Sequence, residues 1–172
     1  MRVAHIPSAA ATARIVSSAD ATERLLYLYA LDACLRPRGD APAAVLAAYH
    51  PLRRAMDGAR GALASLDDRR ALAWARDVAA LCRAEVDTLA PRLVLARGEV
   101  DRRDLRAALL LWAAAEAWGD GGGRWATLAG HAAALAAALD GAVDRGAAGL
   151  LTGGAASRVR ARASGLWAEG GR

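Results

Sequence analysis

Apolar residues recur at intervals of three and four along most of the chain, and no long stretch alternates apolar with polar residues. The first pattern places apolar side chains on one face of a helix, whereas alternation is typical of strands. The sequence therefore predicts an all-α protein. The predicted helices span residues 20–35, 43–66, 68–90, 101–118, 124–139 and 150–163.

Capping and helix-breaking residues indicate where the predicted helices begin and end. Asp20 and Glu23 have the spacing of a capping box, so the first helix is expected to begin there, after a loose lead-in over residues 1–18. Pro51 is expected to kink or restart the second helix, because proline lacks a backbone N–H. Pro91 is expected to end the third helix for the same reason.

The segment 124–139 is almost wholly small and apolar. A helix that is apolar on all sides needs neighbours on all sides, so it is predicted to be the central helix of the bundle. Its longest apolar run has about 15 residues, whereas roughly 20 are needed to cross a membrane. We therefore expect a core helix, with neither a transmembrane span nor a C-terminal membrane anchor, and the N-terminus has no convincing signal peptide.

The composition limits the domain count and the chemistry. The 172 residues suffice for one hydrophobic core, so residues 1–172 are predicted to form a single domain. Lys, Asn, Gln and Phe are absent, which indicates a GC-rich genome, and 18 acidic residues lie among the arginines. This interleaving favours a solvated surface of mixed charge over a nucleic-acid-binding face. Cys34 and Cys82 lack metal-like spacing and are expected to be buried, reduced thiols, and no metal or cofactor is predicted.

The stretch from Trp112 to His131, WAAAEAWGDGGGRWATLAGH, joins two apolar helices through a glycine-rich turn. Arg124 lies in the first turn of the second helix, where a positive charge opposes the helix macrodipole. This position gains nothing for helix stability, so it is better explained by an anionic partner. The pattern therefore predicts that Arg124 receives a carboxylate at the surface.

The glycine-rich corner resembles the first homology motif of the Bcl-2 family, Asp-Gly-x-Asn-Trp-Gly-Arg-x-x-Ala, although the Asn-Trp pair is missing here. The end of the chain is similar to a contracted form of the second motif, Trp-Ile-x-Glu-x-Gly-Gly-Trp. The resemblance implies a Bcl-2-like helical bundle around one central hydrophobic helix, and a divergent, viral pro-survival member. The residues that match the two motifs are Glu116, Trp118, Asp120, Gly121, Gly123 and Arg124, followed by Trp167, Glu169, Gly170 and Gly171.

The resemblance also implies a function, because the family holds amphipathic BH3 helices of pro-apoptotic partners in a hydrophobic groove. Arg124 would pair with the characteristic Asp of a Bim-, Bak-, Bax- or Puma-like ligand. The protein would then inhibit apoptosis in the host cytoplasm, reaching mitochondria through its partners, and would not be an enzyme. The residues expected to line the groove are Val78, Leu81, Leu105, Leu109, Ala113, Glu116, Ala117, Arg124, Thr127, Leu128 and His131.

Two segments compete as the chain's own BH3-like helix. The first contains Leu72 and Asp77, and its distance from the glycine-rich corner suits the family better. The second contains Leu52 and Asp57 and is the more literal match to the motif, but it lies further from that corner.

Two other functions are open from the sequence. Arg124 and His131 have the Arg-x6-His spacing of HEPN ribonucleases, in which such a pair acts on RNA. Alternatively, the protein is a helical scaffold that assembles through its apolar helices. His131 itself has two interpretations, as a groove-floor residue or as a core histidine hydrogen-bonded to a carbonyl.

Overall fold

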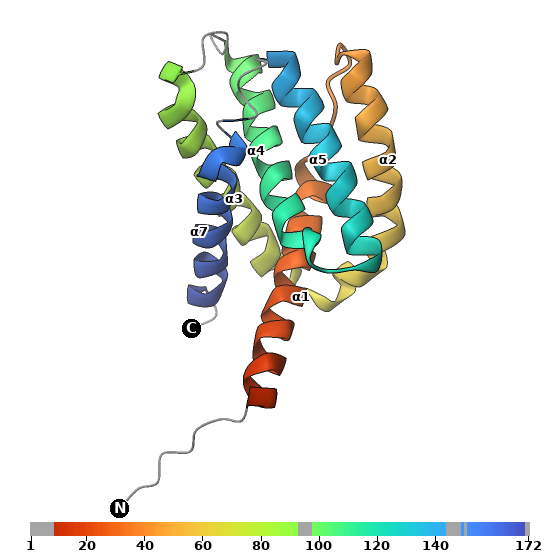
Figure 1. The fold of residues 1–172 in the computed structure, drawn as a ribbon, viewed down its shortest axis with the longest axis vertical. Coiled ribbons are helices and arrows are strands. Elements are labelled where there is room, and N and C mark those ends of the chain that lie inside the picture. The colour runs from red at the N-terminus through yellow and green to blue at the C-terminus, as the bar shows by residue number, and fades with distance from the viewer. Residues whose placement is uncertain (1–8, 93–97, 144–148, 150, 171–172) are drawn as a thin grey trace, which may run out of the picture.

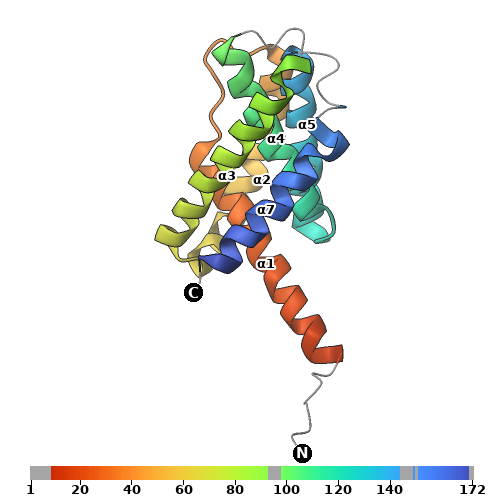
Figure 2. The same ribbon diagram turned by 90° about the vertical axis from the view of Figure 1, so that its left-hand side faces the viewer.

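The computed structural model describes residues 9–92, 98–143, 149 and 151–170, and this part of the chain is all-helical. Figures 1 and 2 show the helices packed side by side in one bundle. Short 3-10 turns η1 (Arg60–Ser65) and η2 (Ala90–Arg92) and a π-helical turn η3 (Leu151–Ala155) connect or extend them. The α-helices are α1 (Ala9–Cys34), α2 (Ala43–Ala59), α3 (Asp68–Leu89), α4 (Glu99–Gly119), α5 (Gly123–Val143) and α7 (Ala156–Glu169).

The central helix is α4, which contacts α1, α3, α5 and α7. Large leucines and a tryptophan on several of its faces explain this position, because burying them removes much apolar surface from water. Its fully buried residues are Leu105, Ala108, Leu109, Leu111, Ala113, Ala114, Ala117 and Trp118.

The prediction that residues 124–139 form the central helix is therefore wrong. Helix α5 packs against α4 and α2, and its remaining side faces solvent. Alanine and glycine carry little apolar surface, so a helix made largely of them loses little by exposing one side. This exposed side is here called the outward face of α5. It comprises Ala126, Thr127, Gly130, Ala134, Ala137 and Gly141.

Helix α5 is also longer than the apolar run from which it was predicted. It has 21 residues, and within the described part of the chain it is the one helix long and apolar enough to cross a membrane by length and composition. Buried core helices pass the same test, and 39% of its most apolar window is buried. The length argument against a transmembrane span therefore does not hold for α5.

Helix α1 begins at Ala9, so the expectation of a loose lead-in up to residue 18 is wrong for the described residues 9–18. Neither glycine nor proline occurs from Ala9 to Cys34, so nothing in this stretch interrupts the helix. The first turns of α1 extend beyond the bundle (Figure 1). Asp20 and Glu23 consequently lie inside the helix and not at its start.

The predicted bounds of α3 agree with the structure, whereas the end of α2 and the position of the last helix differ from it. Asp67 caps α3 by accepting a hydrogen bond from the backbone N–H of Arg70 at 3.1 Å. Helix α3 ends at Leu89, shortly before Pro91. Pro51 lies inside α2, which ends at Ala59 and does not continue as an α-helix to residue 66. The last helix lies later than predicted, because the chain forms a π-helical turn before α7.

Candidate functional site

The turn between α4 and α5 depends on three consecutive glycines. Gly122 and Gly123 have positive φ angles of 65° and 51°, a conformation that other residues rarely adopt. A Cβ atom on Gly121 would lie 2.6 Å from the Cβ of Trp125 and 2.9 Å from the Nε of Arg24. The glycine-rich sequence is thus explained by the geometry of this corner, which sets where α5 begins.

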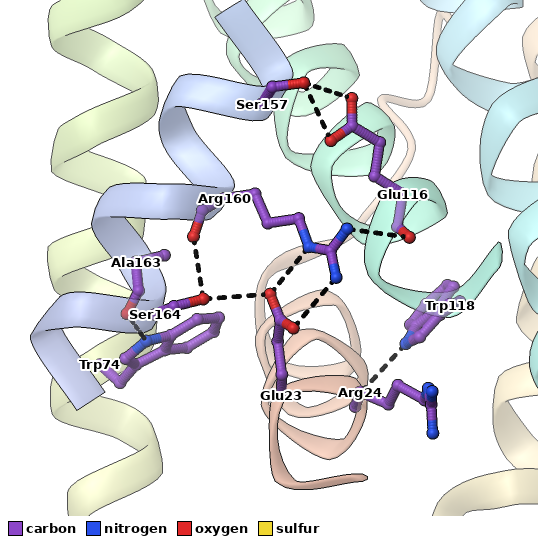
Figure 3. A network of polar contacts seen from close by, with 9 residues as sticks. All are labelled: Glu23, Arg24, Trp74, Glu116, Trp118, Ser157, Arg160, Ala163 and Ser164. Carbon is purple, nitrogen blue, oxygen red and sulfur yellow. Dashed lines mark hydrogen bonds and ion pairs between the residues drawn. The ribbon is translucent and has the colours of Figure 1, made fainter. Parts of the chain in front are cut away.

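Two tryptophans fix the corner against α1. Trp118 is fully buried and donates its indole N–H to the carbonyl of Arg24 at 3.0 Å (Figure 3). The rings of Trp118 and Trp125 lie 6.3 Å apart between centroids. These contacts hold the first turn of α5 in place, and Arg124 projects from it into solvent.

The guanidinium of Arg124 lies over the ring of the neighbouring Trp125, 5.2 Å from its centroid. It forms no ion pair with a carboxylate in the described part of the chain. The first half of the sequence prediction, an exposed cation at the start of α5, is therefore confirmed, whereas its anionic partner stays a prediction.

Arg124 borders an open depression with a volume of about 600 Å³. The other walls come from α1 and from the 3-10 turn η1, and they are small or apolar apart from one serine. We call this site the Arg124 depression. It is lined by Ala21, Leu25, Gly61, Ala62, Ala64, Ser65, Arg124 and Trp125.

The structure does not bring the predicted groove residues together at a surface. Thr127 is exposed like Arg124, while Leu81, Glu116 and His131 are half-buried. The others are core residues, because α4 lies at the centre of the bundle with α1 and α7 over its remaining sides. These buried residues are Val78, Leu105, Leu109, Ala113, Ala117 and Leu128.

Helix α7 covers Glu116, one of the predicted groove residues. Ser157 donates a hydrogen bond to this carboxylate, with its Oγ 2.9 and 3.2 Å from the two oxygens (Figure 3). The backbone carbonyl of Glu116 also accepts from Arg160 at 3.3 Å. Glu116 therefore serves to attach α7 to α4.

Arg160 is the centre of a polar network between α1, α4 and α7 (Figure 3). Its Nε and Nη2 donate to the two carboxylate oxygens of Glu23 at 3.0 and 3.2 Å, and Ser164 donates to the same carboxylate at 3.2 Å. The side-chain hydrogen bond with Glu23 raises the pKa of Arg160.

An aromatic pair lies beside this network. Tyr27 and Trp74 meet edge to face with ring centroids 5.1 Å apart, and Trp74 donates to the carbonyl of Ala163 at 2.9 Å. The Tyr27 hydroxyl is buried without a hydrogen-bond partner among the described residues, and desolvation, followed by the nearby Glu23 charge, raises its pKa well above the usual range. These contacts pack α3 against α1 and α7.

The two BH3-like candidates differ in exposure. Leu72 is exposed, with 37% of its surface accessible, and Asp77 is exposed as well. Leu52 is fully buried, whereas Asp57 is exposed and pairs with Arg53 and Arg60.

Arg124 and His131 are both on α5, but they are not in contact along the helix. They are seven positions apart, which corresponds to about 10.5 Å along an α-helix axis. The His131 side chain has no hydrogen bond within the described part of the chain, so the structure does not supply the carbonyl partner of the core interpretation. The described residues contain no group of three or more His, Cys, Asp or Glu side chains that could hold a metal ion.

One buried acidic residue was not predicted from the sequence. Asp140 is 1% exposed and accepts a hydrogen bond from the indole N–H of Trp112 at 2.9 Å. Burial raises the pKa of the Asp140 carboxyl, and the hydrogen bonds from Trp112 and from the Gly141 backbone partly offset that effect. The sequence signal that could have identified it is its position, because Asp140 is a single acidic residue at the end of the apolar segment 124–139.

Comparisons with family models, with curated proteins and with solved structures found no match for this chain. The Bcl-2 resemblance therefore rests on the sequence motifs alone. The structure shows an all-α bundle with an exposed arginine beside a depression.

Proposed function

We propose that this protein binds an amphipathic helix of a partner protein, and that the helix presents a carboxylate to Arg124. The observation that carries the proposal is the Arg124 depression, where an exposed guanidinium borders walls of small and apolar side chains. A guanidinium can pair with a carboxylate through two hydrogen bonds. Apolar anchors on the same helix would supply binding energy by burying surface in the depression.

The sequence resemblance makes BH3 helices of pro-apoptotic proteins the first partners to test, and inhibition of apoptosis the corresponding role. Arg124 keeps the register-setting role that the resemblance implies. Its surroundings differ from the expected groove, since α1 and η1 line the depression, whereas the predicted α3 and α4 residues are mostly in the core. The bound helix would therefore cross the start of α5 near Leu25 and Trp125.

Calorimetric titration with a panel of BH3 peptides tests this function. Each peptide is compared with a version in which its Asp is replaced by Ala, and the protein with its Arg124→Asp variant. We expect sub-micromolar binding to at least one peptide, and a loss of about tenfold or more from either change, because each removes the charge-assisted pair. Arg162→Asp is the matched control, since Arg162 is exposed on α7 away from the depression. Binding that is unaffected by Arg124→Asp would contradict the proposal.

A second function, self-assembly as a scaffold, is favoured by the outward face of α5. Exposed Gly130, Ala134, Ala137 and Gly141 follow helical spacing, and such small residues let two helices approach closely. Light scattering over a range of concentrations would detect a dimer. Ala134→Arg should then shift it to monomer, while Ala84→Arg, at an exposed position on α3, should not. A protein that stays monomeric at high concentration would rule this function out.

A further inference from the structure

A second cavity lies between α1, α3 and α4, away from Arg124. Its volume is about 170 Å³. Its lining is mainly apolar, with leucines from α1 and α4 and with small residues at the positions between them. The lining residues are Leu31, Cys34, Leu35, Ala79, Cys82, Arg83, Arg106, Ala107 and Leu110.

The cavity exists because small side chains stand where three helices meet. Ala79 and Cys82 on α3 and Ala107 on α4 are too short to fill the space left between Leu31, Leu35 and Leu110, all of which line it. An apolar cavity of about 150 Å³ is large enough to take up benzene. The cavity is thus of a size to hold one apolar ring.

The charged residues of the lining have one sign. Arg83 is exposed on α3, Arg106 is half-buried on α4 and already takes part in another interaction, and none of the described residues that line the cavity is acidic. An apolar interior bordered by the exposed Arg83 guanidinium is complementary to an anion with an apolar tail, because carboxylates form strong charge-assisted hydrogen bonds with arginine.

We propose that the cavity binds a small monocarboxylate whose apolar part is about the size of a benzene ring. The apolar part lies between Leu31, Cys82 and Leu110, and the carboxylate pairs with Arg83. This site is separate from the Arg124 depression, since the two share no lining residue.

Cys34 provides a direct reporter of occupancy. It lines the cavity and is exposed, which corrects the expectation that both thiols are buried, so an alkylating reagent can reach it. Cys82 lines the same cavity but is buried, and desolvation raises the pKa of its thiol to about 12. Because the thiolate is the reactive form, Cys82 should react far more slowly than Cys34. A bound ligand should therefore slow the modification of Cys34 in particular.

The test measures the rate of Cys34 alkylation by N-ethylmaleimide in the presence of three probes of one shape. These are 3-phenylpropanoate, 3-phenylpropan-1-ol and 3-phenylpropylamine, which are anionic, neutral and cationic. At about ten times its Kd the carboxylate should slow the reaction about tenfold, because only the unliganded fraction reacts. The alcohol should protect less at the same concentration, and the amine least. Equal protection by all three probes, or protection by none, would overturn the proposal.

Two variants locate the site. Arg83→Glu should weaken protection by 3-phenylpropanoate about tenfold or more, since it replaces attraction by repulsion at the carboxylate. Arg69→Glu is the matched control, as Arg69 is exposed on the same helix but outside the lining. Ala79→Leu, at an exposed edge of the cavity, should reduce protection by filling the space. Unchanged protection in both Arg83→Glu and Ala79→Leu would contradict the assignment.

Discussion

Arg160 and Glu23, which are 137 residues apart in the chain, form a two-point ion pair with N–O distances of 3.0 and 3.2 Å. The Glu23 carboxylate also accepts a hydrogen bond from Ser164, so one acid on α1 holds two residues of α7 (Figure 3). The pair is partly shielded from water, because 31% of the Arg160 side chain and 14% of the Glu23 side chain are accessible. It is therefore expected to contribute to stability.

Glu23→Ala should destabilise the fold by about 1–3 kcal/mol, because it leaves the half-buried Arg160 without its charged hydrogen-bond acceptor. Urea unfolding followed by circular dichroism measures this loss. Arg158→Ala is the comparison, since 55% of the Arg158 side chain that pairs with Glu85 is accessible, and its removal should cost less. Equal losses from the two variants would show that burial of the Arg160 pair has no special effect.

The buried Asp140 should make stability depend on pH. Its usual pKa is 3.8 and burial raises it in the folded state, so the unfolded chain releases this proton at lower pH than the folded chain does. Stability is therefore lost as pH rises above about 3.8, until the folded carboxyl has also ionised.

Asp140→Asn keeps an oxygen to accept from Trp112 but cannot ionise, so this variant should be more stable than the unsubstituted protein at pH 7. The difference should shrink towards pH 3. Unfolding curves measured across that range test the prediction, with Asp120→Asn, at an exposed position, as the control. A stability difference that is constant with pH would mean that Asp140 does not titrate as described.

Alanine substitutions should lower stability at two glycines of the α4–α5 turn and raise it at a glycine inside α5. Gly122→Ala and Gly123→Ala place a side chain at positive φ and should each cost about 1–2 kcal/mol of stability. Gly130 lies inside α5, with open space around its Cβ position. Gly130→Ala should instead stabilise the protein by about 0.5–1 kcal/mol. Thermal melts compare the three variants. A gain in stability from Gly122→Ala or Gly123→Ala would contradict the turn geometry.

Arg124→Asp should leave the fold intact and slightly more stable. Arg124 is exposed in the first turn of α5, where a negative side chain interacts favourably with the helix dipole by about 0.3–1 kcal/mol. The melting temperature of this variant should therefore equal or exceed that of the unsubstituted protein. A lowered melting temperature would mean that the contact with Trp125 is needed for folding, and the peptide titration would then require Arg124→Gln.

Local sequence signals predicted most helices because they act over a few residues. The third helix was expected to begin at residue 68 and to end at Pro91, and α3 runs from Asp68 to Leu89. The glycines between Trp118 and Arg124 correctly indicated a sharp turn between α4 and α5. The exposed position of Arg124 could also be predicted, since a cation at a helix start gains nothing from burial.

The order of burial among the helices was not predictable in the same way. The segment 124–139 contains fewer charged residues than α4, but most of its apolar positions are occupied by alanine and glycine. Apolar burial scales with area, so Leu105, Leu109 and Trp118 make α4 the better core helix. The predicted groove failed to form at the surface for this reason, since its α4 residues became the core.

By itself the sequence determined that the chain is all-helical, where most of its helices begin or end, and that one arginine starts α5 after a glycine turn. These features follow from backbone preferences and capping, which need only neighbouring residues. Only the tertiary structure decided that α4 is central, that Glu23 pairs with Arg160, and that small residues leave a cavity beside Arg83. Each of these features depends on how helices that are distant in sequence pack against one another, and neighbouring residues do not determine that packing.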